Sequence, residues 1–225
     1  MKTSKSVKNN PEIKKSRRMT GGRAKIAEAL RLLLRDREFN AITTARIAET
    51  SGMSEALLYR YFGDKRGLLH QVLSDFLKDY LDDLEQELEK VKGTVKKLKK
   101  IILSHFHLFE TNRVLAKILL LEVRNYPGYF ESESYGQVRR YSNMIMEVFR
   151  QGVSNGDIKK NISLPAFRNA MLGGIEHTCL PKIVFNKSFS PDVMTEELCK
   201  ILFSGILQYT TKDGKTDNVQ AQLRP

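Results

Sequence analysis

The stretch ITTARIAETSGMSEALLYRYFGDKRGLL, residues 42–69, decides the fold of this chain. It contains two short amphipathic segments joined through Gly52, and each begins at a residue whose side chain can cap a helix. Thr43 precedes the first segment, over residues 44–51, and Ser54 begins the second, which runs to about residue 62. The residues expected to be buried between the two helices are Ile47, Ala48, Met53 and Leu58. The pattern predicts a helix-turn-helix, whose second helix can lie in the major groove of DNA.

The second helix of this pair carries the side chains that would face the duplex. In order, they are Glu55, Ala56, Leu57, Tyr59, Arg60 and Tyr61. The first three would lie at base edges, and the aromatic and basic run after them suits phosphate and sugar contacts. Glu55 either accepts a hydrogen bond from a cytosine amino group or stabilises the positive end of its own helix. Core packing is the alternative role for Tyr59, Tyr61 and Phe62.

At these residues the chain resembles the TetR family of one-component regulators over about residues 23–73. The matching positions are Thr43, Ile47-Ala48, Gly52-Met53-Ser54, Leu58-Tyr59-Arg60-Tyr61-Phe62 and Lys65. The resemblance implies phosphate contacts from Thr43, Tyr59, Tyr61 and Lys65, and the candidate DNA-binding set also includes Thr44 and Ser54. Ala56-Leu57 stand where the family commonly has Gly-Thr, so the operator sequence does not follow from this helix.

The charge of the chain points to a polyanionic partner and is concentrated near the N-terminus. The 225 residues carry a formal net charge of +12. Residues 1–75 hold 16 Lys or Arg against 8 Asp or Glu, so they supply most of the excess. Residues 1–20 are expected to form a flexible basic arm. This arm either reaches the minor groove or backbone of DNA or serves only to keep the protein soluble.

Apolar residues recur at helical spacing through the rest of the chain, and no sustained period-two pattern occurs. A long helix is expected to begin after Asp64, and another over residues 113–125, while Pro181 should kink or end its helix. The fold class is therefore all-α, with an N-terminal three-helix helix-turn-helix domain and a C-terminal helical ligand-binding and dimerisation domain. The expected boundaries are 1–20 for the arm, 21–73 and 74–210 for the two domains, and 211–225 for a polar tail.

The second domain resembles the family only in length and helical layout, which implies an effector pocket and a dimer interface. The candidate pocket residues are Phe106, Phe109, Met144, Met146, Phe149, Met171 and His177. The candidate dimer residues are Ala166, Ala170, Gly173, Gly174, Ile201, Leu202 and Leu207. Internal core packing is the alternative for both sets. The segment LLLEVRNYPGYF, residues 119–130, resembles fatty-acyl-CoA-responsive members such as FadR regulators, which implies a large apolar effector.

Several other classes of protein are disfavoured by the sequence. Cys179 and Cys199 stand outside any metal-type spacing, and no catalytic constellation or phosphate-binding glycine loop is present, so neither a metal, a cofactor nor an enzyme is expected. No apolar run is long enough to span a bilayer, and the cytoplasm is the expected location. The resulting interpretation is a homodimeric regulator, a repressor that binds double-stranded operator DNA and a small-molecule effector. The alternatives are a sequence-indifferent architectural DNA binder, or a helical small-molecule binder or enzyme with a vestigial helix-turn-helix.

Overall fold

Capping side chains set where the first helices begin in the computed structural model, which describes residues 21–206. The N-terminal elements are α1 (Gly22–Leu33), a 3-10 turn (Phe39–Ala41), α2 (Thr44–Ser51), α3 (Glu55–Phe62) and α4 (Lys65–Glu89). Thr43, Ser54 and Asp64 each accept a hydrogen bond from a backbone amide in the first turn of α2, α3 and α4. Gly52 ends α2 in the left-handed region, at φ 65°, which glycine adopts without steric cost.

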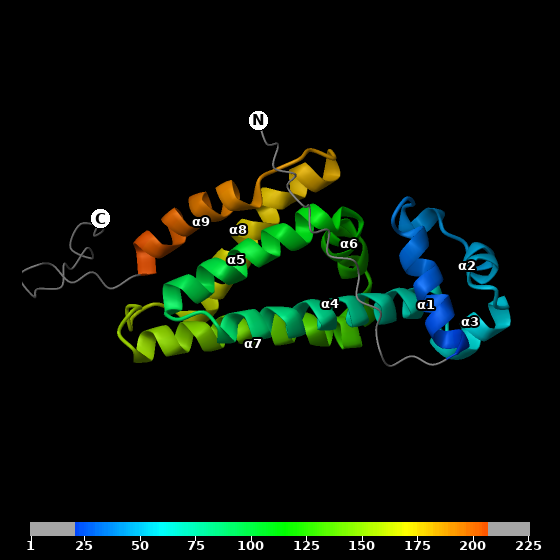
Figure 1. Ribbon diagram of the computed structural model, residues 1–225, viewed down its shortest axis with the longest axis horizontal. Helices are drawn as coiled ribbons and strands as arrows, with labels where there is room; N and C mark the ends of the chain where they lie inside the picture. The colour runs from blue at the N-terminus through cyan, green and yellow to red at the C-terminus, as the bar shows by residue number, and fades with distance from the viewer. Residues whose placement is uncertain (1–20, 207–225) are drawn as a thin grey trace, which may run out of the picture.

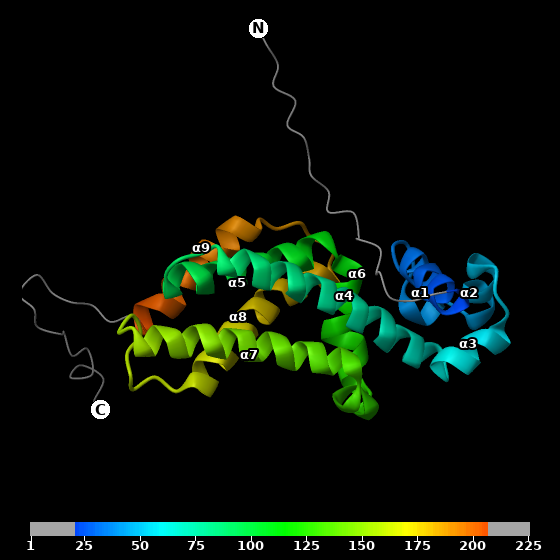
Figure 2. The same ribbon diagram turned by 60° about the horizontal axis from the view of Figure 1, so that its bottom comes forward.

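The remaining elements form an elongated helical domain. They are α5 (Thr94–Thr111), α6 (Arg113–Lys117), a π-helical turn (Ile118–Glu122), 3-10 turns (Val123–Asn125 and Pro127–Glu131), α7 (Glu133–Ser154), α8 (Leu164–Val184) and α9 (Pro191–Ile206). Helices α1 to α3 gather at one end of the molecule, and α4 runs from them along α7 into the larger domain (Figures 1 and 2). Between residues 21 and 206 the chain forms helices and turns but no strand, so the predicted all-α fold is confirmed.

Helix α4 contributes to two separate hydrophobic cores. Its first half, including Leu69 and Leu73, packs with α1, α2 and α3, whereas Leu84 and Leu88 near its end pack with α5, α7, α8 and α9. Full burial of a leucine or phenylalanine side chain stabilises a fold by about 1.5–3 kcal/mol. Because α4 packs in both cores, it connects the end formed by α1, α2 and α3 directly to the helical domain.

The segment over residues 113–125 differs from the single helix that its sequence predicts. After five residues of α6 the backbone widens into a π turn and then tightens into a 3-10 turn. Ala116 is buried in the core of the helical domain, whereas Ile118, Leu119 and Val123 are buried in the N-terminal core. The segment is apolar on nearly every side because it packs on both cores along its length. Val114 and Leu115, before the π turn, also pack against the N-terminal core, and Leu120, within the turn, packs against the core of the helical domain.

Two further expectations concern the C-terminal half. Helix α8 continues three residues past Pro181, so this proline does not end the helix, although its missing amide removes one i→i−4 hydrogen bond near the C-terminal end. The expected boundary between residues 73 and 74 falls inside the continuous α4. The basic arm over residues 1–20, the tail over 211–225 and Leu207 all lie outside the described residues.

Candidate nucleic-acid interface

The exposed face of α3 is the surface on which the predicted DNA contacts converge. Leu58 is fully buried against the N-terminal core, and this fixes the rotation of the helix. Glu55, Ala56, Tyr59 and Arg60 are consequently exposed, at the spacing of one helix face. Tyr59 and Tyr61 keep 49% and 38% of their surface accessible, too much for a role as core aromatics. Leu57 differs from its neighbours because it is half-buried and packs against the core.

Two hydroxyl groups flank this face at the starts of the helices. The Oγ1 of Thr43 accepts a hydrogen bond from the Arg46 amide at 3.1 Å, and Ser54 Oγ accepts one from the Leu57 amide at 3.4 Å. A hydroxyl that accepts a bond still has its own proton to donate. Thr43 and Ser54 can therefore cap their helices and donate to a phosphate oxygen at the same time.

The carboxylate of Glu55 is bound within the protein. The Oγ1 of Thr44 donates a hydrogen bond to Glu55 Oε2 at 2.5 Å, and this bond joins the first turns of α2 and α3. Sequence analysis placed both residues in the DNA-facing set without anticipating the contact between them. This bond favours a role for Glu55 in supporting the local helix geometry. A contact between Glu55 and a base would use the other carboxylate oxygen, Oε1.

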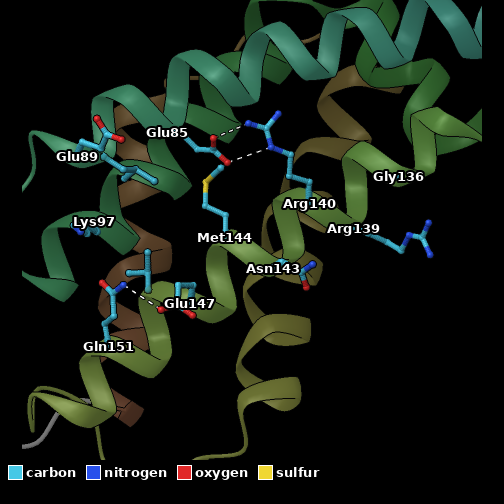
Figure 3. Close-up of a pocket in the computed structure, with 12 residues that line it drawn as sticks. Glu85, Glu89, Lys97, Gly136, Arg139, Arg140, Asn143, Met144, Glu147 and Gln151 are labelled. Carbon is cyan, nitrogen blue, oxygen red and sulfur yellow. Dashed lines mark hydrogen bonds and ion pairs between the residues drawn. The ribbon is translucent and has the colours of Figure 1, made fainter.

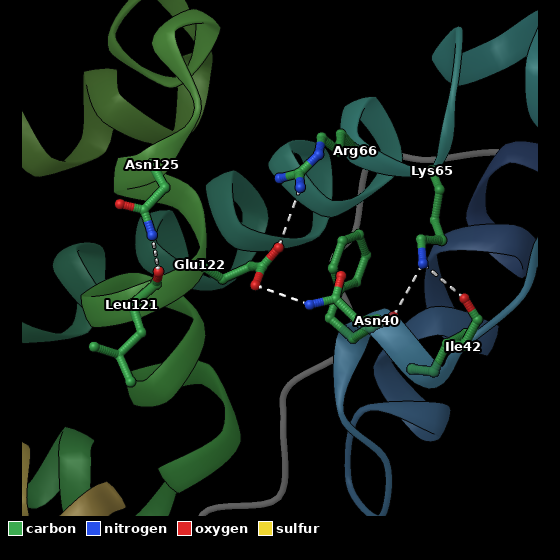
Figure 4. Close-up of polar contacts among 8 residues, drawn as sticks. Asn40, Ile42, Lys65, Arg66, Leu121, Glu122 and Asn125 are labelled. Atoms are coloured by element: carbon green, nitrogen blue, oxygen red, sulfur yellow. Dashed lines mark hydrogen bonds and ion pairs between the residues drawn. The ribbon is translucent and has the colours of Figure 1, made fainter.

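Lys65 is held by the backbone that precedes α2. Its Nζ donates to the carbonyl oxygens of Ile42 at 2.8 Å and Phe39 at 3.1 Å, and it lies 4.3 Å from the centre of the Phe39 ring (Figure 4). Burial lowers the pKa of Lys65, and the Arg66 guanidinium acts in the same direction while Glu122 opposes it. An ammonium has three hydrogens, so two carbonyl partners leave one for a phosphate.

Glu122, from the π turn, bridges the helical domain and the N-terminal elements from α1 to the start of α4, residues 22–66, which we call the reading head. Its Oε2 accepts from Asn40 Nδ2 at 3.2 Å, and its Oε1 accepts from Arg66 at 3.3 Å (Figure 4). A second ion pair, between Lys117 and Glu38 at 2.7 Å, lies across the same junction. Sequence analysis missed this junction because its partners lie 56 to 82 residues apart and none belongs to a local motif.

The candidate pocket residues of the helical domain do not come together around one cavity. Phe106, Phe109, Phe149 and Met171 are buried in its core, Met144 and Met146 are half-buried, and His177 is exposed on α8. An open groove of about 860 Å³ does lie between α4 and α7, and Met144 is the one candidate that lines it (Figure 3).

The candidate dimer residues fall into two groups. Ala166, Ala170 and Gly173 are exposed along one side of α8, and Ile201 on α9 is 74% exposed. Gly174 instead faces α9 of its own chain, where an added Cβ would lie 2.9 Å from Leu198 Cδ1, and Leu202 packs against the core. The exposed apolar side chains of Val184, Phe185 and Val193 extend the α8–α9 surface, and sequence analysis missed them.

Residues 21–206 contain neither a metal-binding cluster nor a membrane-spanning helix. No group of His, Cys, Asp and Glu between residues 21 and 206 is arranged to hold a metal ion. Over the same residues, no helix is both long enough and apolar enough to cross a membrane.

Two family models together match most of the chain. Residues 26–72 match the model described as bacterial regulatory proteins, tetR family, and residues 73–205 match the one described as YsiA-like protein, C-terminal region. The curated HTH-type transcriptional repressor KstR2 of Mycolicibacterium smegmatis is 22% identical over 132 residues, which make up 57% of this chain and 63% of that repressor. The matched stretch thus spans less than two thirds of that relative.

Solved structures share the fold of the chain. FadR of Bacillus subtilis, in complex with stearoyl-CoA, superposes with a TM-score of 0.72 at 19% identity, covering 80% of this chain and 97% of that one. A transcriptional regulator of Saccharomonospora viridis in complex with choline superposes with a TM-score of 0.69 at 18% identity, covering 83% and 98%. At these identities the likeness establishes the architecture alone.

Proposed function

The chain belongs to the TetR family of bacterial regulatory proteins, and from this premise we propose that it is a homodimeric repressor released from operator DNA by a small, largely apolar effector. The observation that carries the proposal is the exposed face of α3, on which Ala56, Tyr59 and Arg60 stand clear of the core. A helix presented in this way fits the major groove, with its first turn at the base edges.

The proposed contacts divide into two kinds. Glu55, Ala56 and the exposed part of Leu57 lie where base edges would be, so they would determine sequence preference. The phosphate set consists of Thr43, Ser54, Tyr59, Arg60, Tyr61 and Lys65. Thr44, whose only hydroxyl hydrogen is donated to Glu55, would act through the orientation of Glu55. Phosphate contacts position the protein on the duplex and carry no sequence information directly.

Dimerisation is proposed through α8 and α9. Small residues at 166, 170 and 173 let a second helix approach closely, and Ile201 adds apolar surface that a lone chain leaves in water. A twofold pairing of this surface would hold two copies of α3 for two half-sites, about one helical turn of DNA apart.

We also propose that a small-molecule effector controls DNA binding. FadR of Bacillus subtilis takes stearoyl-CoA and the Saccharomonospora regulator takes choline, so this fold accommodates effectors of different chemistry. The apolar interior of the helical domain favours an effector with a substantial apolar body. Such a ligand releases DNA only if it binds the DNA-incompetent arrangement more tightly, and the difference in affinity sets the extent of release.

Selection of duplexes from a random-sequence pool tests the proposal. We expect a two-fold-symmetric consensus that binds at least about 10³-fold more tightly than a scrambled duplex at the same salt concentration. Sedimentation equilibrium of the full chain should give twice the mass of the monomer. Equal affinity for selected and scrambled duplexes would identify an architectural DNA binder instead.

A further inference from the structure

A cluster of polar side chains lies inside the helical domain, between α4, α5 and α7. The ring nitrogen Nδ1 of His105 lies 3.0 Å from the Oη of Tyr141, and the rings of Tyr80 and Tyr141 are 6.4 Å apart. Gln137 is one helical turn before Tyr141 on α7, so the two side chains share a face. Four hydrogen-bonding side chains thus adjoin one another within an otherwise apolar core.

Two atoms of this cluster are buried without a hydrogen bond. The Oε1 of Gln137 has no partner within residues 21–206. The Oη of Tyr80 lies near the Ser104 side chain but outside normal hydrogen-bonding geometry, and it too has no other partner there. Unsatisfied buried polar atoms destabilise a fold and are few in native proteins, so each requires an explanation. A bound ligand that supplies the missing hydrogen bonds is one such explanation.

The groove between α4 and α7 runs close to this cluster along α7, because Met144, which lines it, is one turn after Tyr141, although none of the four cluster side chains lines the groove itself. Leu88 and Val148 line the groove and belong to the core of the helical domain, and Met144, which also lines it, packs against that core as Tyr80 and Tyr141 do (Figure 3). The wall between the groove and the cluster therefore includes a flexible methionine, a side chain that adapts readily to a new neighbour.

Charged groups of both signs lie around the cluster. The Arg124 guanidinium donates two hydrogen bonds to the Glu176 carboxylate, at 2.8 and 2.6 Å. The groove is lined by three basic and three acidic side chains, namely Lys97, Arg139, Arg140, Glu85, Glu89 and Glu147. Burial lowers the pKa of His105 to about 4, so its imidazole is neutral at pH 7. A carboxylate buried at the cluster would have no cationic partner among its four side chains, and desolvating it would be costly.

We propose that Tyr80, His105, Gln137 and Tyr141 form a recognition site for an uncharged hydroxyl or primary amide group on an apolar molecule that enters from the groove. Such a group can donate to Gln137 Oε1 and accept from Tyr80 Oη. A carboxylate can accept from Tyr80 Oη but has no hydrogen to donate to Gln137 Oε1. The inference rests on the proposed function, because it specifies the chemical class of the effector.

Three probes of equal chain length test the inference: octan-1-ol, octanamide and octanoate, titrated calorimetrically into the full chain at pH 7.5. Octanol and octanamide should bind, and octanoate should bind at least about ten-fold more weakly. Gln137→Met and Tyr80→Phe keep the volume of each side chain and should each weaken octanamide binding about three- to ten-fold, which corresponds to one lost hydrogen bond. Octanoate binding should be unaffected by Gln137→Met but weakened by Tyr80→Phe, because a carboxylate can accept from Tyr80 Oη and has no hydrogen to donate to Gln137 Oε1.

Gln151→Met is the matched control, because Gln151 lines the same groove on α7 but pairs with Glu147 instead of facing the cluster. Octanoate binding as tight as octanamide, an equal effect of Gln151→Met and Gln137→Met, or no binding of any probe at millimolar concentration would each overturn the inference. None of these results bears on operator preference. Loss of operator preference would instead refute the proposed function and leave the order of probe affinities intact.

Discussion

The Nζ of Lys65 lies 2.8 Å from the carbonyl oxygen of Ile42, so the first residue of α4 fastens the segment that leads into α2. The contact spans 23 residues and places a cation where the chain turns from α1 toward the DNA-reading helices. Lys65 is thus part of the internal structure of the reading head, even though the family pattern marks it as a phosphate contact.

Replacing Lys65 with methionine should destabilise the protein. The carbonyl oxygens of Phe39 and Ile42 lose their donor while the length of the side chain is kept, which should lower the free energy of unfolding by about 1 kcal/mol. Urea unfolding measures this loss. Lys78→Met, at an exposed site on the same helix, should change the free energy by much less, and equal effects would contradict the anchoring role.

The phosphate role of Tyr59 can be tested by comparing selected with scrambled duplexes, and that of Lys65 through salt dependence. Tyr59→Phe removes one hydroxyl from an exposed ring and should weaken binding to selected and scrambled duplexes alike, by about two- to ten-fold, because a phosphate contact carries no sequence information. The same titrations on Lys65→Met should show a salt slope lower by about one. Tyr126→Phe alters a comparably exposed ring away from α3, and its affinity for DNA should match that of the wild type.

Glu55→Gln separates the two roles of this residue. The amide oxygen of glutamine can still accept from Thr44, so the bond between α2 and α3 is retained while the negative charge is lost. If Glu55 reads a base, selection with the variant should return a changed preference at one base pair, worth about 1–3 kcal/mol. An unchanged consensus with tighter binding to every duplex would assign Glu55 to local structure alone.

Substitution of Glu122 should loosen the junction. Glu122→Ala removes the partner of both Arg66 and Asn40. We expect faster amide hydrogen exchange over residues 39–42 and 118–126, because the contacts that hold these segments together become fewer. Glu131→Ala changes an exposed glutamate that follows the junction and should leave the exchange of both segments unaltered.

The buried imidazole of His105 predicts how stability depends on pH. Its pKa is lowered to about 4 in the folded protein by burial, whereas the unfolded chain retains the ordinary value of 6.5. Between these values the unfolded state binds more protons, so stability should fall as the pH drops from 6.5 to 4. His70, whose pKa burial also lowers, acts in the same direction.

The contribution of His105 can be isolated with His105→Gln, since glutamine stays neutral and can still bond to Tyr141. The difference in unfolding free energy between pH 7.5 and 4.5 should shrink by about 1–3 kcal/mol relative to the wild type. The exposed His107 provides a control, and His107→Gln should retain the full dependence. An undiminished pH dependence in His105→Gln would show that this imidazole titrates normally.

Local signals in the sequence were enough to predict the reading head. Thr43, Ser54 and Asp64 cap their helices as expected, because a cap depends on residues three positions away, and the all-α architecture followed from spacing alone. The exposure of Tyr59 followed from the same periodicity.

Contacts between distant segments could not be predicted in this way. Apolar spacing does not distinguish a residue that faces a ligand from one that faces the core, so Phe106 and Met171, expected near a pocket, lie buried in the core. The Lys65 anchor and the Glu122 bridge each join segments far apart in sequence. The π turn escaped prediction because its residues also suit an ordinary helix.

The π turn at Ile118–Glu122 has a consequence for how relatives of this chain can differ in length. A π turn accommodates one residue more than an α-helical turn, and this one lies in a segment that packs on both cores. Deleting one residue here would convert the turn to regular helix without shortening either neighbouring segment. Single-residue gaps in homologous sequences should accordingly cluster at this turn, and lineages with and without the gap would orient their reading heads differently.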